Sequence, residues 1–281
     1  MGVINITPDS FSDGGAFLDA DEAIHHALHL LNEGADILDL GAESTRPDSH
    51  AGSVNALSAE EEQARLLPVI EGVLKARPDA ILSIDTYKAS TARAALAAGA
   101  EIINDVSGLT WLPAMPEACA EAGCGVILMH TRGLPDEWTS QSKLAPDALL
   151  ETVRDGLAAS LATARIAGIA PEAIVLDPGY GFGKRFNENY TLLIRQQELL
   201  SLGYPILAGL SRKSFLGHTL SPLHQGNPAT PTQREAATIA AHTAAILHGA
   251  SIIRTHSVRS GVEAACIADA ILQAQTEAAS E

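Results

Sequence analysis

Eight short apolar segments alternate with longer amphipathic stretches along the 281-residue chain, and this alternation restricts its fold more than any other feature. Each segment is apolar almost throughout, as expected for parallel β-strands that helices cover. The predicted strands are residues 2–6, 35–41, 80–85, 101–106, 125–130, 173–177, 205–211 and 251–256.

The stretches between these segments have the apolar spacing of amphipathic helices. Asp19 or Asp21 is placed to cap the first, and Ser58 with Glu61 has the capping-box pattern at the start of the second. A glycine follows most of them, where helices commonly end. The predicted helices are residues 20–33, 58–76, 88–98, 113–122, 146–167, 187–201, 232–248 and 260–278.

Eight strand–helix units in a chain of this length predict a (β/α)8 barrel, a single domain that spans residues 1–281. The alternative is a doubly wound open sheet, which usually has about six strands or fewer. No G-x-G-x-x-G pattern follows the first segment, so the sequence favours the barrel.

The chain carries 34 acidic and 18 basic residues, and its net charge of −16 disfavours nucleic acid and anionic membranes as partners. Its three cysteines include no C-x-x-C pair. No secretory signal follows Met1, and no apolar stretch is long enough to cross a bilayer. These observations predict a cytoplasmic protein with reduced thiols.

Every predicted strand ends at or runs into polar residues. In a barrel the carboxyl ends of all strands meet at one rim, where barrel enzymes have their active sites. One polar strand end is usually a helix cap, but eight together indicate a ligand site. In chain order they are Asn5; Ser44, Thr45 and Arg46; Asp85; Asn104 and Asp105; His130; Asp177; Ser211, Arg212 and Lys213; Arg254 and His256.

Asp85, Asn104 and Asp177 offer acceptors that suit a planar heterocycle with several N–H donors. Such a site rejects ligands that lack those donors, because its buried acceptors would then stay unpaired. The carboxylates could instead bind a metal, pair with basic side chains or belong to a phosphorylated-sugar site.

Arg46, Arg212, Lys213, Arg254 and His256 belong to strands two, seven and eight, which lie on one side of a closed barrel. Barrels commonly bind phosphate there, so these cations predict an anionic group such as diphosphate or carboxylate. For Arg212, the alternative is a surface pair with a neighbouring acidic residue.

Other features allow two interpretations. Asn5 is either an oxygen ligand of a phosphate-bound Mg²⁺ or a turn residue before Pro8. His130 is either a general base or, as is commoner for a lone histidine, a structural residue. LDPGYGFGK (176–184) lacks the Walker spacing, so its glycines are expected to bring the backbone and Phe182 near a flat ligand. The stretches 7–18, 42–57 and 217–231 are predicted loops.

Seven motifs extend over nearly the whole chain: GVINITPDSFSDGG (2–15), GAESTRP (41–47), SIDT (83–86), INDVSG (103–108), LDPGYGFGK, GLSRKSFLG (209–217) and IIRTH (252–256). Together they resemble the motifs of the dihydropteroate synthases. The resemblance implies a usually dimeric (β/α)8 barrel of folate biosynthesis. Such an enzyme condenses 6-hydroxymethyl-7,8-dihydropterin diphosphate with 4-aminobenzoate, which sulfonamide drugs mimic, to give 7,8-dihydropteroate and diphosphate.

The resemblance also implies roles for single residues. The pterin would be bound by Asp85, Asn104, Met129, Asp177, Gly209 and Lys213. The diphosphate would be bound by Arg254, His256 and, through Mg²⁺, Asn5. The aminobenzoate would be bound by Thr45, Arg46, Pro47, Phe182, Lys213 and Ser214. The catalytic residues would be Asp85, Lys213, Arg254 and His256.

In the implied reaction, diphosphate leaves the pterin methylene carbon, Asp85 stabilises the cationic pterin, and the aniline nitrogen attacks. Such catalysis is mainly electrostatic and positional and needs no nucleophilic side chain. A pterin-binding methyltransferase would not need the SRKS and STRP motifs, and a non-catalytic relative would be expected to lack a diphosphate or loop residue; this chain has them all.

The chain departs from the family pattern at three places. It begins directly at the first strand, where family members usually have preceding residues, so a short segment before Met1 is expected to be missing. Asp48 follows STRP where glycine is common, in a second loop that is longer than usual. Ser257 stands where aspartate is frequent.

Overall fold

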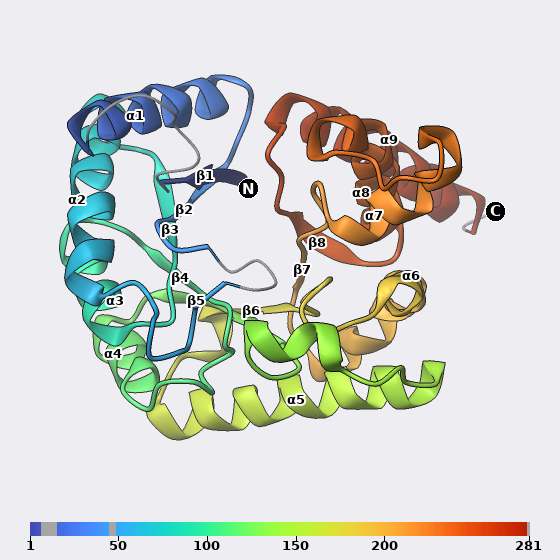
Figure 1. Ribbon diagram of the computed structural model, residues 1–281, viewed down its shortest axis with the longest axis horizontal. Coiled ribbons are helices and arrows are strands. Elements are labelled where there is room, and N and C mark those ends of the chain that lie inside the picture. Colours follow the sequence, from blue (N-terminus) through green and yellow to red (C-terminus); the bar gives the residue numbers. More distant parts are fainter. Residues whose placement is uncertain (7–15, 45–48, 280–281) are drawn as a thin grey trace.

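A computed structural model describes residues 1–6, 16–44 and 49–279 of the chain. Eight parallel strands pair in chain order, and the sheet closes where Gly2 pairs with Thr255. Val3 N donates to Thr255 O at 2.9 Å, and Thr255 N donates to Met1 O at 3.0 Å. The predicted (β/α)8 barrel is confirmed (Figure 1).

The strands are β1 (Gly2–Asn5), β2 (Ile37–Gly41), β3 (Ile81–Asp85), β4 (Ile102–Asp105), β5 (Gly125–Met129), β6 (Ile174–Asp177), β7 (Ile206–Ala208) and β8 (Ala250–Ile253). Between and after them lie the helices, which form the outer ring in Figure 1. They are α1 (Ala16–Asn32), α2 (Ala59–Ala76), α3 (Ala89–Ala97), α4 (Met115–Ala122), α5 (Pro146–Ala167), α6 (Phe186–Arg195), α7 (Ser214–Thr219), α8 (Glu235–Leu247) and α9 (Val258–Ala278).

The strands have two apolar faces, as continuous apolar runs require. Their outer side chains pack against the helices in the main core, which includes Ile4, Leu40, Ile84 and Leu128. Their inner side chains fill the barrel with a smaller cluster: Met1, Ile37, Ile102, Ile127, Val175, Leu207 and Ile252.

Strand alternation then places the polar residues of the site. Because successive side chains point to opposite faces, the residue two positions after each inner apolar residue also faces the barrel interior, nearer its carboxyl end. These second residues are Val3, Asp39, Asn104, Met129, Asp177, Gly209 and Arg254. On four of the seven strands an apolar inner residue is thus followed by a polar one nearer the rim.

Local signals at helix ends have the predicted form in α2, α4 and α5. Ser58 Oγ accepts from Glu61 N at 3.2 Å, and Glu61 Oε2 accepts from Ser58 N at 3.1 Å. Gly123 and Gly168 end α4 and α5 with φ of 63° and 88°, a conformation that glycine adopts without strain.

Several predicted boundaries are wrong. Helix α1 begins at Ala16, so Asp19 and Asp21 lie inside the helix and not at its first position. The predicted helix 187–201 is α-helical only to Arg195 and continues as a 3-10 helix, Gln196–Leu202. The predicted loop 217–231 includes the end of α7 and the 3-10 helix Ser221–His224.

Within the described part of the chain, no helix is both long and apolar enough to cross a membrane.

Candidate active site

A buried hydrogen-bonded network joins three predicted site residues below the rim. Arg254 Nε donates to Asp39 Oδ2 at 2.5 Å, and Arg254 Nη2 donates to Asp85 Oδ2 at 2.9 Å. Asn104 Nδ2 donates to Asp39 Oδ2 at 3.1 Å, and Ser83 Oγ donates to Asp39 Oδ1 at 2.7 Å. The structure therefore brings Asp85, Asn104 and Arg254 together, and Asp85 is also the salt-bridge partner that one alternative predicted.

The pKa values of both Asp85 and Arg254 in this network are shifted from their ordinary values. Burial raises the pKa of Asp85 to about 7, although the charge of Arg254 acts against the shift. Burial also opposes the charge of Arg254, but the carboxylates of Asp39 and Asp85 outweigh it and raise the pKa of the guanidinium. Arg254 is therefore a permanent cation at this rim.

Asp177, at the end of β6, offers a second buried carboxylate. Its Oδ1 accepts from Gly179 N at 2.7 Å, and burial raises its pKa. A side chain at Gly209 would place its first carbon 3.8 Å from Asp177 Oδ2. The glycine therefore leaves space beside this oxygen, as a ring-binding site requires.

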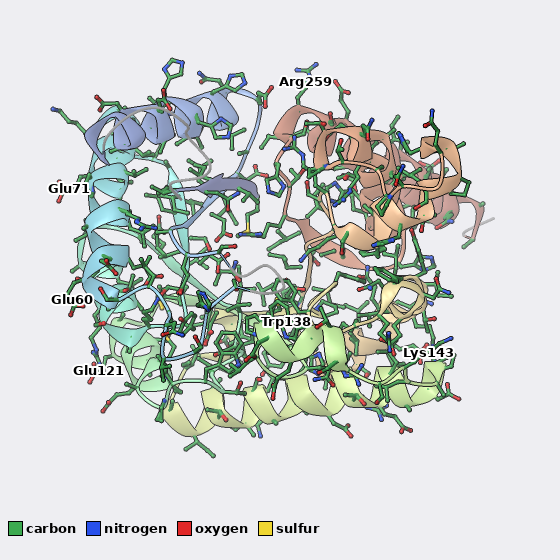
Figure 2. The ribbon with its side chains drawn as sticks, in the orientation of Figure 1. Glu60, Glu71, Glu121, Trp138, Lys143 and Arg259 are labelled. Atoms are coloured by element: carbon green, nitrogen blue, oxygen red, sulfur yellow. The ribbon has the colours of Figure 1, made fainter. Side chains whose placement is uncertain are left out.

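Lys213, Phe182 and Met129 form a wall next to Asp177. The Lys213 ammonium lies 3.9 Å from the centroid of the Phe182 ring, and burial lowers the pKa of Lys213 to about 7. Phe182 packs against the cluster that contains Met129 and meets Trp138 edge-on, with the ring centroids 4.9 Å apart. Figure 2 shows Trp138 on the inner side of the helix ring. A cation and apolar surfaces at one wall suit a flat, polar heterocycle.

The three predicted diphosphate residues lie where the barrel closes. His256 Nδ1 lies 3.0 Å from Ser211 Oγ, which also accepts from His256 N at 3.2 Å. Asn5 ends β1, the strand next to β8 in the closed barrel. Arg254 and His256 follow β8, so all three belong to adjacent strands.

Arg212 lies beside an acidic residue. Its Nε is 3.7 Å from Glu235 Oε2, and its side chain is 34% exposed. This ion pair agrees with the alternative given for Arg212, a pair with a neighbouring acidic residue.

The predicted aminobenzoate residues are only partly described. Thr45, Arg46 and Pro47 lie outside the described residues. Ser214 is exposed at the start of α7, directly after Lys213. Phe182 and Lys213, the other two, touch each other.

A buried ionic triad, which sequence reasoning missed, holds the chain just before Thr45. Lys88 Nζ lies 2.6 Å from Glu43 Oε2 and 3.2 Å from Glu62 Oε2. Glu43 Oε1 accepts from Leu57 N at 2.9 Å. The triad thus ties both ends of the second loop to α2 and the start of α3.

His130 faces away from the barrel interior. A carbon added at Gly156, in α5, would lie 2.4 Å from His130 Cδ2, so the ring lies between β5 and α5. Burial lowers its pKa well below the ordinary value. The structural interpretation of His130 therefore fits this position, and the general-base interpretation does not.

Asp39 and Lys184 were also not predicted from the sequence as site residues. Lys184 Nζ donates to His130 O at 2.9 Å and to Phe182 O at 3.2 Å, which fixes the loop after β6. For Asp39 a signal existed: it is a charged residue in the apolar run ILDLG, and strand alternation places it on the face opposite to Leu38 and Leu40.

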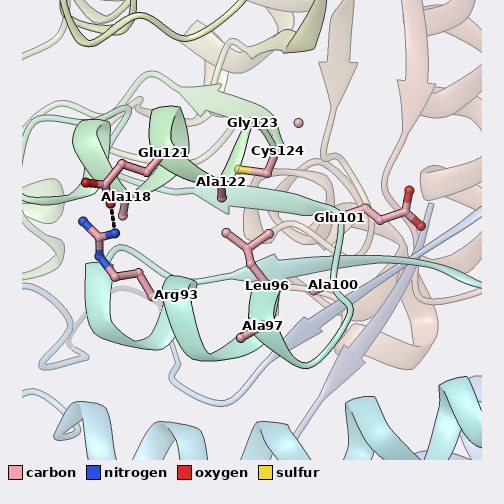
Figure 3. A pocket seen from close by; sticks show the side chains of 11 residues that line it. Arg93, Leu96, Ala97, Ala100, Glu101, Ala118, Glu121, Ala122, Gly123 and Cys124 are labelled. Carbon is pink, nitrogen blue, oxygen red and sulfur yellow. Dashed lines mark hydrogen bonds and ion pairs between the residues drawn. The ribbon is translucent and has the colours of Figure 1, made fainter.

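A separate hollow of about 750 Å³ lies between α3 and α4, at the amino-terminal end of the strands (Figure 3). Arg93 and Glu121 form an ion pair across it, and Leu96 and Cys124 contribute to its lining. Because barrel active sites lie at the opposite end, this hollow is separate from the candidate site.

Comparisons with known proteins agree on one family. The family model for pterin-binding enzymes matches residues 1–256. The dihydropteroate synthase of Mycobacterium leprae is 43% identical over 274 residues, which cover 98% of this chain and 93% of the relative.

Solved structures agree in fold. A dihydropteroate synthase from Clostridium difficile, crystallised with pteroic acid, matches with a TM-score of 0.85 and 41% identity over 96% of this chain and 95% of the other. The enzyme of Xanthomonas albilineans, solved with 4-aminobenzoic acid, matches with a TM-score of 0.84 and 39% identity over 97% and 92% of the two chains.

Proposed function

Because the chain belongs to the dihydropteroate synthase family of pterin-binding enzymes, we infer that it condenses 6-hydroxymethyl-7,8-dihydropterin diphosphate with 4-aminobenzoate. It is thus a transferase of folate biosynthesis whose products are 7,8-dihydropteroate and diphosphate. The observation that supports this most directly is the rim itself, where buried acceptors and a permanent cation lie together.

The acceptors bind and orient the pterin. The Asp177 carboxylate and the Asn104 amide oxygen accept from ring N–H groups, and Gly209 leaves room beside Asp177. Met129, Phe182 and Lys213 cover the ring. Binding by a fixed set of acceptors selects the pterin edge, because a ring without these donors would leave them unpaired.

The charges act on the bond that breaks. The Arg254 guanidinium and His256 bind the diphosphate and stabilise its negative charge as the C–O bond to the pterin methylene lengthens. Asp85 stabilises the positive charge that develops on the pterin. The aniline nitrogen of the aminobenzoate then attacks the methylene carbon and loses a proton. No covalent enzyme intermediate is needed.

Mg²⁺ is expected to accompany the diphosphate. No group of three His, Cys, Asp or Glu side chains that could hold a metal ion occurs among the described residues. Asn5 offers a neutral oxygen and would hold an Mg²⁺ that arrives with the diphosphate, since Mg²⁺ commonly takes only one or two protein ligands. When bound, Mg²⁺ would neutralise charge on the leaving diphosphate.

The aminobenzoate site, where sulfonamides would compete, is proposed to consist of Thr45, Arg46, Pro47, Phe182, Lys213 and Ser214.

A homodimer is also proposed. Ile267 and Ile271, one turn apart on α9, are 61% and 39% exposed, and such a stripe suits an interface. The three free cysteines support a cytoplasmic location, because thiols persist in reducing compartments.

The test is direct. Purified protein with the pterin diphosphate, 4-aminobenzoate and Mg²⁺ should form dihydropteroate and diphosphate in equal amounts, and a chelator should stop turnover. Asp85→Ala should abolish turnover in a protein that still unfolds cooperatively. Failure of the folded wild-type protein to form product would exclude the proposed function.

A further inference from the structure

In strand register Asp39 lies one layer below Asp85 and Asn104, because Asp39 pairs with Ser83, whereas Gly41, two residues later, pairs with Asp85, which in turn pairs with Asn104. It belongs to β2 and is completely buried, with 0% of its surface exposed. Three donors, from β3, from β4 and from the residue after β8, converge on its carboxylate: Ser83 Oγ at 2.7 Å, Asn104 Nδ2 at 3.1 Å and Arg254 Nε at 2.5 Å. Two of these donors, Asn104 and Arg254, belong to the proposed site.

The contact with Asp39 determines which end of the Asn104 amide faces the ligand. An ionised carboxylate can only accept hydrogen bonds, so the amide nitrogen of Asn104 must point down to Asp39. The amide oxygen is then directed away from Asp39. Asn104 therefore presents an acceptor, which is what an N–H group of a heterocycle needs.

The Asp39 carboxylate also orients the guanidinium group of Arg254. Arg254 donates through Nε to Asp39 and through Nη2 to Asp85, so both ends of one edge of the guanidinium are held. These contacts use two of about five N–H groups, and the others can donate to an anion. A side chain held at two points recognises diphosphate with less loss of conformational entropy than a freely rotating one.

We propose that Asp39 is a positioning residue of the pterin diphosphate site, which holds the Asn104 amide and the Arg254 guanidinium in the orientations that bind the substrate. The proposal rests on the proposed function. Asp39 itself contacts neither substrate; it acts through the two side chains above it.

Replacing Asp39 with asparagine removes the negative charge of the side chain but keeps its shape. In Asp39→Asn, the amide oxygen can still accept from Arg254 and Asn104 while its nitrogen donates to Ser83 Oγ. The charge is then lost and the hydrogen bond with Ser83 is reversed, whereas the contacts with Asn104 and Arg254 remain. Because charge-assisted hydrogen bonds are roughly twice as strong as neutral ones, we expect Asp39→Asn to weaken binding of Mg²⁺–diphosphate and of 6-hydroxymethylpterin about tenfold. Asp39→Ala, which also removes the acceptor, should weaken both further.

Asp105 provides a matched control. It is another fully buried aspartate, on β4, but it accepts from the backbone nitrogens of Ser107 and Leu109 at 2.8 and 2.9 Å. Asp105→Asn removes the same charge from an equally buried aspartate that has no hydrogen bond to Asn104 or Arg254. Because an amide nitrogen cannot accept from a backbone N–H, this variant also loses one hydrogen bond, so it is the more disruptive of the two changes to its own surroundings. Its dissociation constants should stay within about twofold of the wild-type values.

The experiment measures the dissociation constant of Mg²⁺–diphosphate by calorimetry and of 6-hydroxymethylpterin by fluorescence, with the KM for the aminobenzoate substrate as a third readout. Asp39→Asn should raise both dissociation constants and leave that KM nearly unchanged. Equal effects of Asp39→Asn and Asp105→Asn, or unchanged dissociation constants in Asp39→Asn, would overturn the proposal.

Ser83→Ala covers the case in which Asp39→Asn does not fold. It keeps the charge of Asp39, removes one bond that orients it, and should raise the same constants about threefold; no change would count against the proposal. These binding measurements need no turnover. A wild-type protein that binds both ligands while the variants behave normally refutes only the role of Asp39, whereas a wild-type protein that binds neither refutes the proposed function as well.

Discussion

Asp85 and Lys213 both change their ionisation near neutral pH, because burial raises the pKa of Asp85 to about 7 and lowers the pKa of Lys213 to about 7. The proposed reaction needs the carboxylate charged and the ammonium charged. Below pH 7 Asp85 takes up a proton, and above it Lys213 loses one. We therefore expect kcat/KM for the pterin substrate to be bell-shaped, with a maximum near neutral pH and about a tenfold loss per unit on each side.

Lys213→Arg separates the two limbs of this profile. Arginine stays protonated at every accessible pH, so the alkaline limb should disappear and the acid limb should remain. The measurement is kcat/KM from about pH 5.5 to about pH 8.5 in constant ionic strength. A flat wild-type profile, or an alkaline limb that survives in Lys213→Arg, would show that these two groups do not control the rate.

His130 is predicted to matter for stability and not for catalysis. Its ring is buried between β5 and α5, and removal of a side chain there leaves a cavity. We expect His130→Ala to lower the free energy of unfolding by about 2 kcal/mol or more and to change kcat by less than about threefold at a temperature where the variant is folded. Denaturant unfolding and steady-state assays measure the two effects. A kcat loss of two orders of magnitude would restore the general-base interpretation.

At the level of elements, the triad of Glu43, Lys88 and Glu62 connects the loop after β2 to α2 and α3. Burial raises the pKa of Glu62, and the neighbouring Lys88 ammonium opposes this shift. Lys88→Met would leave two buried carboxylates without their cation. Because loss of one partner of a buried ion pair costs about 3–5 kcal/mol, we expect a large fall in stability.

Lys88→Met should also raise the KM for the aminobenzoate substrate more than the KM for the pterin substrate, because Glu43 lies two positions before Thr45. Arg77→Met is the matched control. Arg77 forms an exposed pair with Asp79 just beyond the other end of α2, and its loss should change neither the melting temperature nor either KM noticeably. Equal effects of the two variants would exclude a special role for the triad.

The extent to which the elements could be predicted depends on where their stabilising contacts lie. Continuous apolar runs predicted all eight strands, because both faces of each strand are buried. The end of α6 was not predictable in this way. Gln196, the first residue of the 3-10 segment, is buried because its side chain contacts Tyr180 and Ala245, which periodicity does not encode. Strand β7 is shorter than predicted, with an irregular register at Ile206 and Leu207.

In the candidate site, too, residues set by the local pattern could be predicted, and residues that depend on distant partners could not. Strand-end position and residue type identified Asp85, Asn104, Asp177 and Arg254, because the topology of a barrel alone brings such residues together. Asp39 and Lys88 were missed because their importance comes from partners on other elements, 215 residues away in the case of Asp39 and Arg254. Roles for ligands came from the family motifs and not from spacing.

At the level of the whole molecule, the basic side chains of the site stand among acidic ones. Figure 2 shows Glu60, Glu71 and Glu121 on the outer side of the helix ring, in agreement with a net charge of −16. At the rim, Arg254 pairs with Asp39 and Asp85, and Lys213 interacts with Asp177. Because acidic groups offset these cations at long range, we expect the anionic substrate to be selected by direct contact and not by long-range steering.

The site also connects most of the barrel, because its residues lie at the carboxyl ends of β1, β3, β4, β5 and β6 or follow β7 and β8. If residues 1–281 form one domain, unfolding should be a single transition, and a ligand that contacts several strands should stabilise the whole barrel.

At ligand concentrations of about 100 times the dissociation constant, binding contributes about 2.7 kcal/mol, so 6-hydroxymethylpterin with Mg²⁺–diphosphate should raise the melting temperature by about 5 °C. Asp177→Ala should keep the single transition and lose most of the pterin-dependent shift, as calorimetry can measure. Two transitions of which only one responds to ligand would show that the barrel does not unfold as a unit.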